Sequence, residues 1–200
     1  MWTFAFFVAV IVAFSSLAIS EELGGPLPPE PAERNQGVQV PRAELDELFS
    51  RLAQAESDAE ATAIYMQVQA KFQRSESEIA RLLMARASTE VGAGRYPAAL
   101  SILDKLVEVE PSWAEAWNRR ATVRYLAGDF PGSMADIAET LTRESRHLGA
   151  LSGMAMIEEE SGHPEDALKI VERQLQIGPH LPEPRAREER LRKLVEGRGI

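Results

Sequence analysis

Apolar residues of this 200-residue chain recur at helical spacing, and from residue 80 onward the pattern repeats every 34 positions. Three blocks align without a gap over residues 80–113, 114–147 and 148–181. Each block holds two apolar-periodic segments separated by a short break, which is the pattern of two helices joined by a turn. A period of this length indicates a helical repeat array in which each block is one hairpin. The expected helices span residues 80–93, 97–110, 114–127, 131–144, 148–161 and 164–177.

The aligned columns show which residue types define the repeat. A bulky residue comes early in the first helix, a small residue follows four positions on, and a glycine precedes the turn. A small residue then occupies the second helix, and a proline or serine closes the block. The columns are Leu83, Trp117 and Leu151; Ala87, Ala121 and Ala155; Gly94, Gly128 and Gly162; Ala99, Ser133 and Ala167; and Pro111, Ser145 and Pro179. The glycines suit the left-handed backbone that ends a helix, and Pro97, Pro131 and Pro164 fall where the second helix starts.

These columns resemble the tetratricopeptide repeat (TPR) family. The resemblance implies an all-α fold, a right-handed α-solenoid of TPR helix hairpins, and the binding of other proteins as the mode of action. The runs at residues 117–122 and 146–153 look like an exported, proteobacterial type of TPR protein of undefined activity.

The segments outside the repeats predict further elements. Residues 42–79 contain two amphipathic helices, which we expect to pack as an N-terminal helical hairpin cap on the first repeat. Residues 182–200 are expected to form a C-terminal capping helix, centred on residues 185–195, and a tail. Residues 21–41 hold five prolines and three glycines, so they are expected to form an extended linker.

Residues 2–19 carry no charge, and Ala18-Ile19-Ser20 matches the small-x-small pattern of a signal-peptide cleavage site. This predicts a signal peptide over residues 1–20, export and a periplasmic location. The alternative is an uncleaved anchor in the inner membrane that faces the periplasm, because 18 uncharged residues almost reach the roughly 20 that span a bilayer. In that alternative, residues 1–20 are the only membrane contact. The chain has no cysteine, which excludes a lipoprotein anchor, a disulfide framework and a thiolate metal site.

Charge and motif content exclude several functions. The net charge is −9, which argues against nucleic acid as a partner because phosphate binding needs clustered Lys and Arg. His147, His163 and His180 fall in turns without metal-ligand spacing, so we expect solvated side chains and no metal. The sequence contains no phosphate-binding loop and no catalytic triad pattern, so we expect neither cofactor nor enzymatic activity.

Arg86 and Arg120 depart from the family pattern, in which this position is a Leu packed between helices. A buried guanidinium must be paired, so Glu90, Asp104 or Asp136 are expected as partners. Two interpretations remain open: a structural salt-bridge ladder, or a site that receives a carboxylate of a partner.

The resemblance places the partner-binding surface on the concave face, lined by the first helix of each repeat. The residues expected there are Met84, Ser88, Asn118, Thr122, Tyr125, Ser152 and Met156. Their mixed polarity suits a peptide segment held by a few hydrogen bonds and an aromatic anchor. Trp117 is expected in the core, and Trp113 is either a packing lid or an exposed anchor.

The sequence therefore predicts a non-catalytic scaffold that binds a peptide segment of an envelope protein partner. The alternative is a membrane-tethered assembly subunit of an envelope complex.

We predict that the exported chain is cleaved after Ser20, because Ala18 and Ser20 are the small residues that signal peptidase requires. N-terminal sequencing of the exported protein should then begin at Glu21. A sequence that begins at Met1 in a membrane fraction would support the anchored alternative instead.

Overall fold

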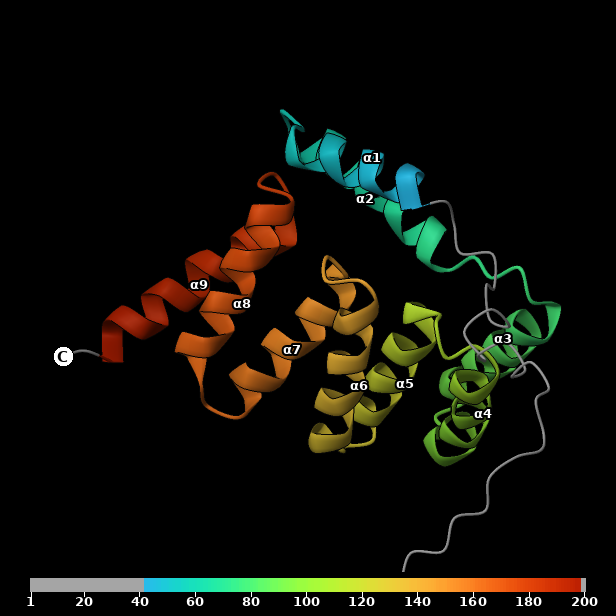
Figure 1. The fold of residues 1–200 in the computed structure, drawn as a ribbon. Helices are drawn as coiled ribbons and strands as arrows, with labels where there is room; N and C mark the ends of the chain where they lie inside the picture. Colours follow the sequence, from blue (N-terminus) through green and yellow to red (C-terminus); the bar gives the residue numbers. More distant parts are fainter. Residues whose placement is uncertain (1–41, 199–200) are drawn as a thin grey trace, which may run out of the picture. The chain divides into compact units, whose positions relative to one another are not determined.

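The computed structural model describes residues 42–198, and these residues form nine α-helices and no strand (Figure 1). The expected all-α class is confirmed, and the six repeat helices begin and end within two residues of the predicted positions. The predicted signal peptide and linker lie outside the described residues. The helices are α1 (Arg42–Ala53), α2 (Asp58–Phe72), α3 (Glu78–Gly92), α4 (Tyr96–Val109), α5 (Ala114–Leu126), α6 (Phe130–Arg143), α7 (Leu148–Glu160), α8 (Pro164–Ile177) and α9 (Pro182–Arg198).

The turns inside the three repeats share one geometry, which follows from their glycines. Gly94, Gly128 and Gly162 have φ of 69°, 80° and 83°, the left-handed backbone that the sequence predicts. At the first turn, the N–H of Gly94 donates to the Val91 carbonyl, and the N–H of Arg95 donates to the Glu90 carbonyl. The same bond pair recurs at the other two turns. These bonds satisfy carbonyls at the helix end, so each first helix stops at the same point of the repeat.

Each repeat is a helix pair that packs on the next pair. Within the repeats, α3 packs on α4, α5 on α6 and α7 on α8, and between repeats α4 packs on α5 and α6 on α7. Small residues make close approach possible: the Ser133 hydroxyl of α6 donates to the Ala121 carbonyl of α5 at 2.8 Å. The repeat cores are built from the aligned columns, because Ala87, Ala121, Ala155 and the bulky residues beside them are buried or half-buried there.

The last helix, α9, covers the apolar face of α8. Leu191 is fully buried and packs with Ala155, Ala167 and Val171. The helix starts at Pro182, three residues before the predicted start. Two prolines in the first turn are tolerated because the N–H groups there have no partner within the helix.

The α1–α2 hairpin lies along the loops that connect the repeats, and not on the outer face of α3 where the sequence analysis placed it. Its core residues Leu48, Phe49 and Leu52 pack with Leu148 at the start of α7 and Leu181 before α9. The Trp113 indole N–H, in the loop before α5, donates to the carbonyl of Phe72 at 2.8 Å. Ion pairs extend the contact, from Arg146 to Asp46 and from Arg185 to Asp58. The hairpin thus contacts the two loops between the repeats and the segment that joins the last repeat to α9.

Candidate functional site

The expected binding residues lie on the first helices of the three repeats: two on α3, three on α5 and two on α7. The helices α5 and α7 pack against each other, so the structure brings the residues of the second and third repeats together. The Tyr125 hydroxyl of α5 donates to the Glu160 carboxylate of α7. Met84 packs at the edge of the first repeat's core and Ser88 is exposed. The surface of α5 and α7 formed by Asn118, Thr122, Tyr125, Ser152 and Met156 is called the α5–α7 surface below.

Most polar groups of the α5–α7 surface already hold one internal hydrogen bond. The Thr122 hydroxyl donates to the Asn118 carbonyl at 2.9 Å, and the Ser152 hydroxyl accepts from the Gln174 amide at 2.8 Å. The Asn118 amide donates to Glu115 at 2.9 Å. The hydrogen of the exposed Thr122 hydroxyl is used in this bond, but the oxygen keeps lone pairs that can accept a second hydrogen bond. At Thr122 the surface therefore presents a hydrogen-bond acceptor, and it also carries the half-buried Met156.

Tyr125 is held in a defined orientation at one end of the α5–α7 surface. Its ring stacks on Phe130 with the centroids 5.6 Å apart. The hydrogen bond to the Glu160 carboxylate is the main reason that the pKa of Tyr125 is raised above its ordinary value, and burial adds to it. An aromatic ring fixed in this way can serve as an anchor at little entropic cost.

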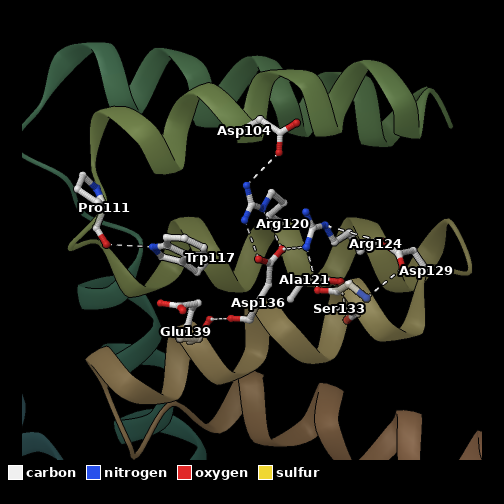
Figure 2. Close-up of polar contacts among 12 residues, drawn as sticks. Asp104, Pro111, Trp117, Arg120, Ala121, Arg124, Asp129, Ser133, Asp136 and Glu139 are labelled. Atoms are coloured by element: carbon white, nitrogen blue, oxygen red, sulfur yellow. Dashed lines mark hydrogen bonds and ion pairs between the residues drawn. The ribbon is translucent and has the colours of Figure 1, made fainter. Parts of the chain in front are cut away.

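Arg120 lies between α4, α5 and α6 and is paired on both sides (Figure 2). Its guanidinium donates twice to Asp136, from Nε at 2.9 Å and from Nη2 at 2.7 Å, and once to Asp104, from Nη1 at 2.9 Å. Arg124 adds a further contact to Asp136 at 3.2 Å. The side chain of Asp136 is 2% exposed and that of Arg120 is 12% exposed. Two of the three expected partners are therefore confirmed, and Arg120 is structural.

Glu90, the third expected partner, pairs with Arg95 instead. Arg86, which shares the column of Arg120, is exposed and not buried in a seam. The reason lies in the neighbouring helices: Ile102 stands in the first repeat where the second has Asp136, and among the described helices only α4 makes extensive contact with α3.

Trp113 and Trp117 both have structural roles. Trp117 is half-buried, and its indole N–H donates to the Pro111 carbonyl at 3.0 Å. The guanidinium groups of Arg120 and Arg143 lie over its ring, at 4.9 and 4.4 Å from the ring centroid. Trp113 is also half-buried and is bonded to Phe72, so it acts as a packing lid. Figure 2 shows the Trp117 contact beside the Arg120 cluster.

The prediction that His147 is solvated is wrong. His147 is fully buried, and its ring stacks on Phe72 with the centroids 4.4 Å apart. Its Nδ1 accepts from the Ala150 backbone N–H at 3.1 Å, so Nε2 carries the hydrogen and donates to Glu115 at 3.2 Å. Ring stacking and helix capping together offset the loss of hydration. His163 and His180 do lie at the surface.

Glu115 is 3% exposed and accepts hydrogen bonds from three side chains. The donors are His147, Asn118 and Arg119. Burial is the largest single influence and favours the neutral acid, but these donors and charges together hold the pKa of Glu115 below its ordinary value. No local sequence pattern indicates this pair, because its members are 32 residues apart and meet only when α7, which His147 caps, packs against α5.

A cavity of about 150 Å³ lies beside this pair, between the α1–α2 hairpin and the loop before α5. Leu45, Phe72 and Trp113 form its apolar walls, and Lys71 and Glu144 are among the charged residues that line it. Sequence reasoning missed this cavity because its walls come from segments that are brought together only by the position of the hairpin. Within residues 42–198, no group of three or more His, Asp or Glu side chains is arranged to hold a metal ion.

Comparison with known proteins identifies the family. The tetratricopeptide repeat family model matches residues 80–123. A TPR repeat-containing protein of Rhizobium etli is 38% identical over 177 residues, which cover 86% of this chain and 85% of the relative. The chain belongs to the tetratricopeptide repeat family.

Solved structures support the fold. The first TPR of Spaghetti (RPAP3), solved bound to an HSP90 peptide, superposes with a TM-score of 0.56 at 18% identity, over 60% of this chain and 98% of that one. The Arabidopsis OM64 TPR domain gives a TM-score of 0.53 at 16% identity, over 58% of this chain and 96% of that one. At these identities the two structures show the fold alone, and the expected α-solenoid of TPR hairpins is confirmed.

We predict that Asp136→Ala lowers the free energy of unfolding by about 3–5 kcal/mol, because it leaves two guanidinium groups without their buried partner. Asp104→Ala is the matched control. It removes a carboxylate from the same Arg120, but the Asp104 side chain is 55% exposed, so the loss should be about 0–1 kcal/mol. Urea unfolding curves measure both, and equal losses would contradict the structural role of Asp136.

We also predict that Glu115 makes the stability depend on pH in the acid range. A lowered pKa in the folded state stabilises the fold above the unfolded value of 4.5, and this contribution is lost as the pH falls through the folded pKa. Glutamine does not ionise, so the Glu115→Gln variant has no such pH-dependent contribution to lose. The difference in urea midpoint between the wild type and Glu115→Gln should therefore shrink from about pH 7 to about pH 3. A constant difference would mean that the pKa of Glu115 is the same in the folded and unfolded states.

Proposed function

We propose that this protein is a non-catalytic scaffold whose α5–α7 surface binds a peptide segment of an envelope protein partner. TPR proteins generally mediate protein–protein interactions and are typically non-catalytic. The observation that carries the proposal is the convergence of Thr122, Tyr125, Ser152 and Met156 from two repeats onto neighbouring helices.

The chemistry of the α5–α7 surface supports an extended peptide as the ligand. Hydroxyl oxygens that have already donated their hydrogens suit the backbone N–H groups of a peptide. Tyr125 supplies a fixed ring, and Met156 supplies an adaptable apolar contact. The TPR of Spaghetti was solved with a bound peptide, and its shared fold supports this mode of binding.

The non-catalytic role is supported by the environment of the acid–base pair. Glu115 and His147 are buried at 3% and 0% exposure, and their hydrogen bonds serve helix capping and packing. Both ring nitrogens of His147 are engaged within the protein, by Ala150 and Glu115, whereas a general base needs an atom that reaches the substrate.

We place the protein in the periplasm, on the basis of the uncharged segment at residues 2–19 and the small residues before Glu21. Among the described helices, none has the length and apolar character that crossing a bilayer requires. The same N-terminal segment supports the second candidate, a subunit tethered to the inner membrane that helps to assemble an envelope complex.

We predict that Thr122→Arg abolishes capture of the partner from an envelope extract, because a long cation on the α5–α7 surface blocks the peptide. Thr142→Arg is the matched control: Thr142 is also exposed and also donates to the carbonyl four residues earlier, but it lies on α6. Both changes are at exposed helix positions, so both should alter stability by roughly 0.5 kcal/mol or less. Proteins captured by the wild type and Thr142→Arg, but lost with Thr122→Arg, are the partners. Equal capture by all three would place the binding site elsewhere.

A further inference from the structure

The helix α3 carries an exposed apolar stripe between two opposite charges. Ile79 and Leu82 are 62% and 68% exposed, although both side chains are large and aliphatic. Glu78 lies one turn before Leu82 and Arg86 one turn after it, and both are exposed. Glu78, Ile79, Leu82 and Arg86 are called the α3 stripe below.

The position equivalent to Leu82 is a buried interface in both later repeats. Leu82 corresponds to Ala116 and Ala150, and both alanines are 0% exposed. In those repeats the second helix of the preceding repeat covers this face, since α4 packs on α5 and α6 on α7. The α1–α2 hairpin does not take that place on α3, because it packs on the loops near Leu148 and Leu181. The α3 stripe is therefore a repeat interface whose partner helix is missing from the described residues.

The second repeat shows what Arg86 lacks. Arg120, its equivalent, takes a carboxylate from the covering helix, Asp104, and another from its own repeat, Asp136. Within residues 42–198, neither the Arg86 side chain nor the Glu78 side chain forms a hydrogen bond or ion pair, and Glu90, one turn from Arg86, is bonded to Arg95. The α3 stripe thus offers one cation and one anion for pairing with a covering helix.

We propose that the α3 stripe is a homodimer interface, in which α3 packs antiparallel on α3 of a second copy of this chain. Glu78 and Arg86 lie four residues before and four residues after Leu82. A two-fold axis through Leu82 therefore places Glu78 opposite Arg86 of the second copy, and Arg86 opposite Glu78 of the second copy. Each charge of the stripe then faces an opposite charge. The two copies of Leu82 meet at the axis, and Ile79 faces the small Ala85 of the second copy.

No other described surface repeats this arrangement. The remaining large exposed apolar residues are Met66, Val109, Leu126 and Leu194. Four residues before these positions stand Arg190 for Leu194, Lys105 for Val109 and a threonine for both Met66 and Leu126, so none of them has an acid where Leu82 has Glu78. This interface is separate from the α5–α7 surface, so it is independent of the proposed function. It involves a single helix face, which is small against the roughly 1,200–2,000 Å² of a stable interface, so the dimer should dissociate on dilution.

Charge reversal tests the proposal directly. In sedimentation equilibrium, the purified wild-type chain should show a monomer–dimer equilibrium. Glu78→Arg and Arg86→Glu should each weaken dimerisation at least about tenfold, because each places like charges opposite each other. A tenfold change corresponds to about 1.4 kcal/mol. The double variant Glu78→Arg/Arg86→Glu should regain most of the lost affinity. The double reversal of the exposed Asp166 and Lys169 pair on α8 is the control and should leave dimerisation unchanged. Circular dichroism verifies that each variant is folded.

Cross-linking locates the axis, because the chain has no native cysteine. A short bismaleimide should link two copies of Leu82→Cys, but not two copies of Leu194→Cys on α9, whose side chain is also exposed. Three results would each overturn the homodimer. The chain could stay monomeric up to about 1 mM, or the double variant could dimerise as weakly as the single variants. Alternatively, Leu82→Cys could be cross-linked only to another protein.

Discussion

A single helical hairpin of this protein cannot bury both of its faces, so every repeat depends on contact with its neighbours. This constraint explains the main features of the structure. Ala116 and Ala150 are fully buried because the preceding repeat covers them, and Leu191 of α9 covers the last repeat. The same constraint leaves Leu82 uncovered, since the α1–α2 hairpin packs on the loops of the array.

The second repeat replaces part of its apolar interface with a buried ion pair. Where the third repeat has Met154 and Ile170, the second has Arg120 and Asp136. Such a pair loses hydration energy, and here the geometry offsets the loss: two bonds join the same two side chains, and Asp104 and Arg124 extend them. Apolar side chains tolerate small shifts, but bidentate hydrogen bonds do not. We infer that the pair fixes the register of α5 against α4 and α6.

A second polar cluster joins the hairpin to the repeats. His147 caps α7, donates to Glu115 on α5 and stacks on Phe72 of α2. The three contacts link two repeats and the α1–α2 hairpin through one ring. This arrangement holds the hairpin beside the start of α5, where the cavity lined by Leu45, Phe72 and Trp113 lies.

The sequence by itself determined the repeat period, the boundaries of the six repeat helices within two residues and the all-α class, because these depend on local spacing and on residues such as Gly128 that act within one turn. It also indicated that Arg120 needs a carboxylate, because a buried charge must be paired. The tertiary structure decided which acids serve Arg120, that Arg86 stays exposed, that His147 is buried and where the α1–α2 hairpin packs. Each of these depends on which helix covers a given face, and a 34-residue pattern contains no information about a hairpin that lies outside it.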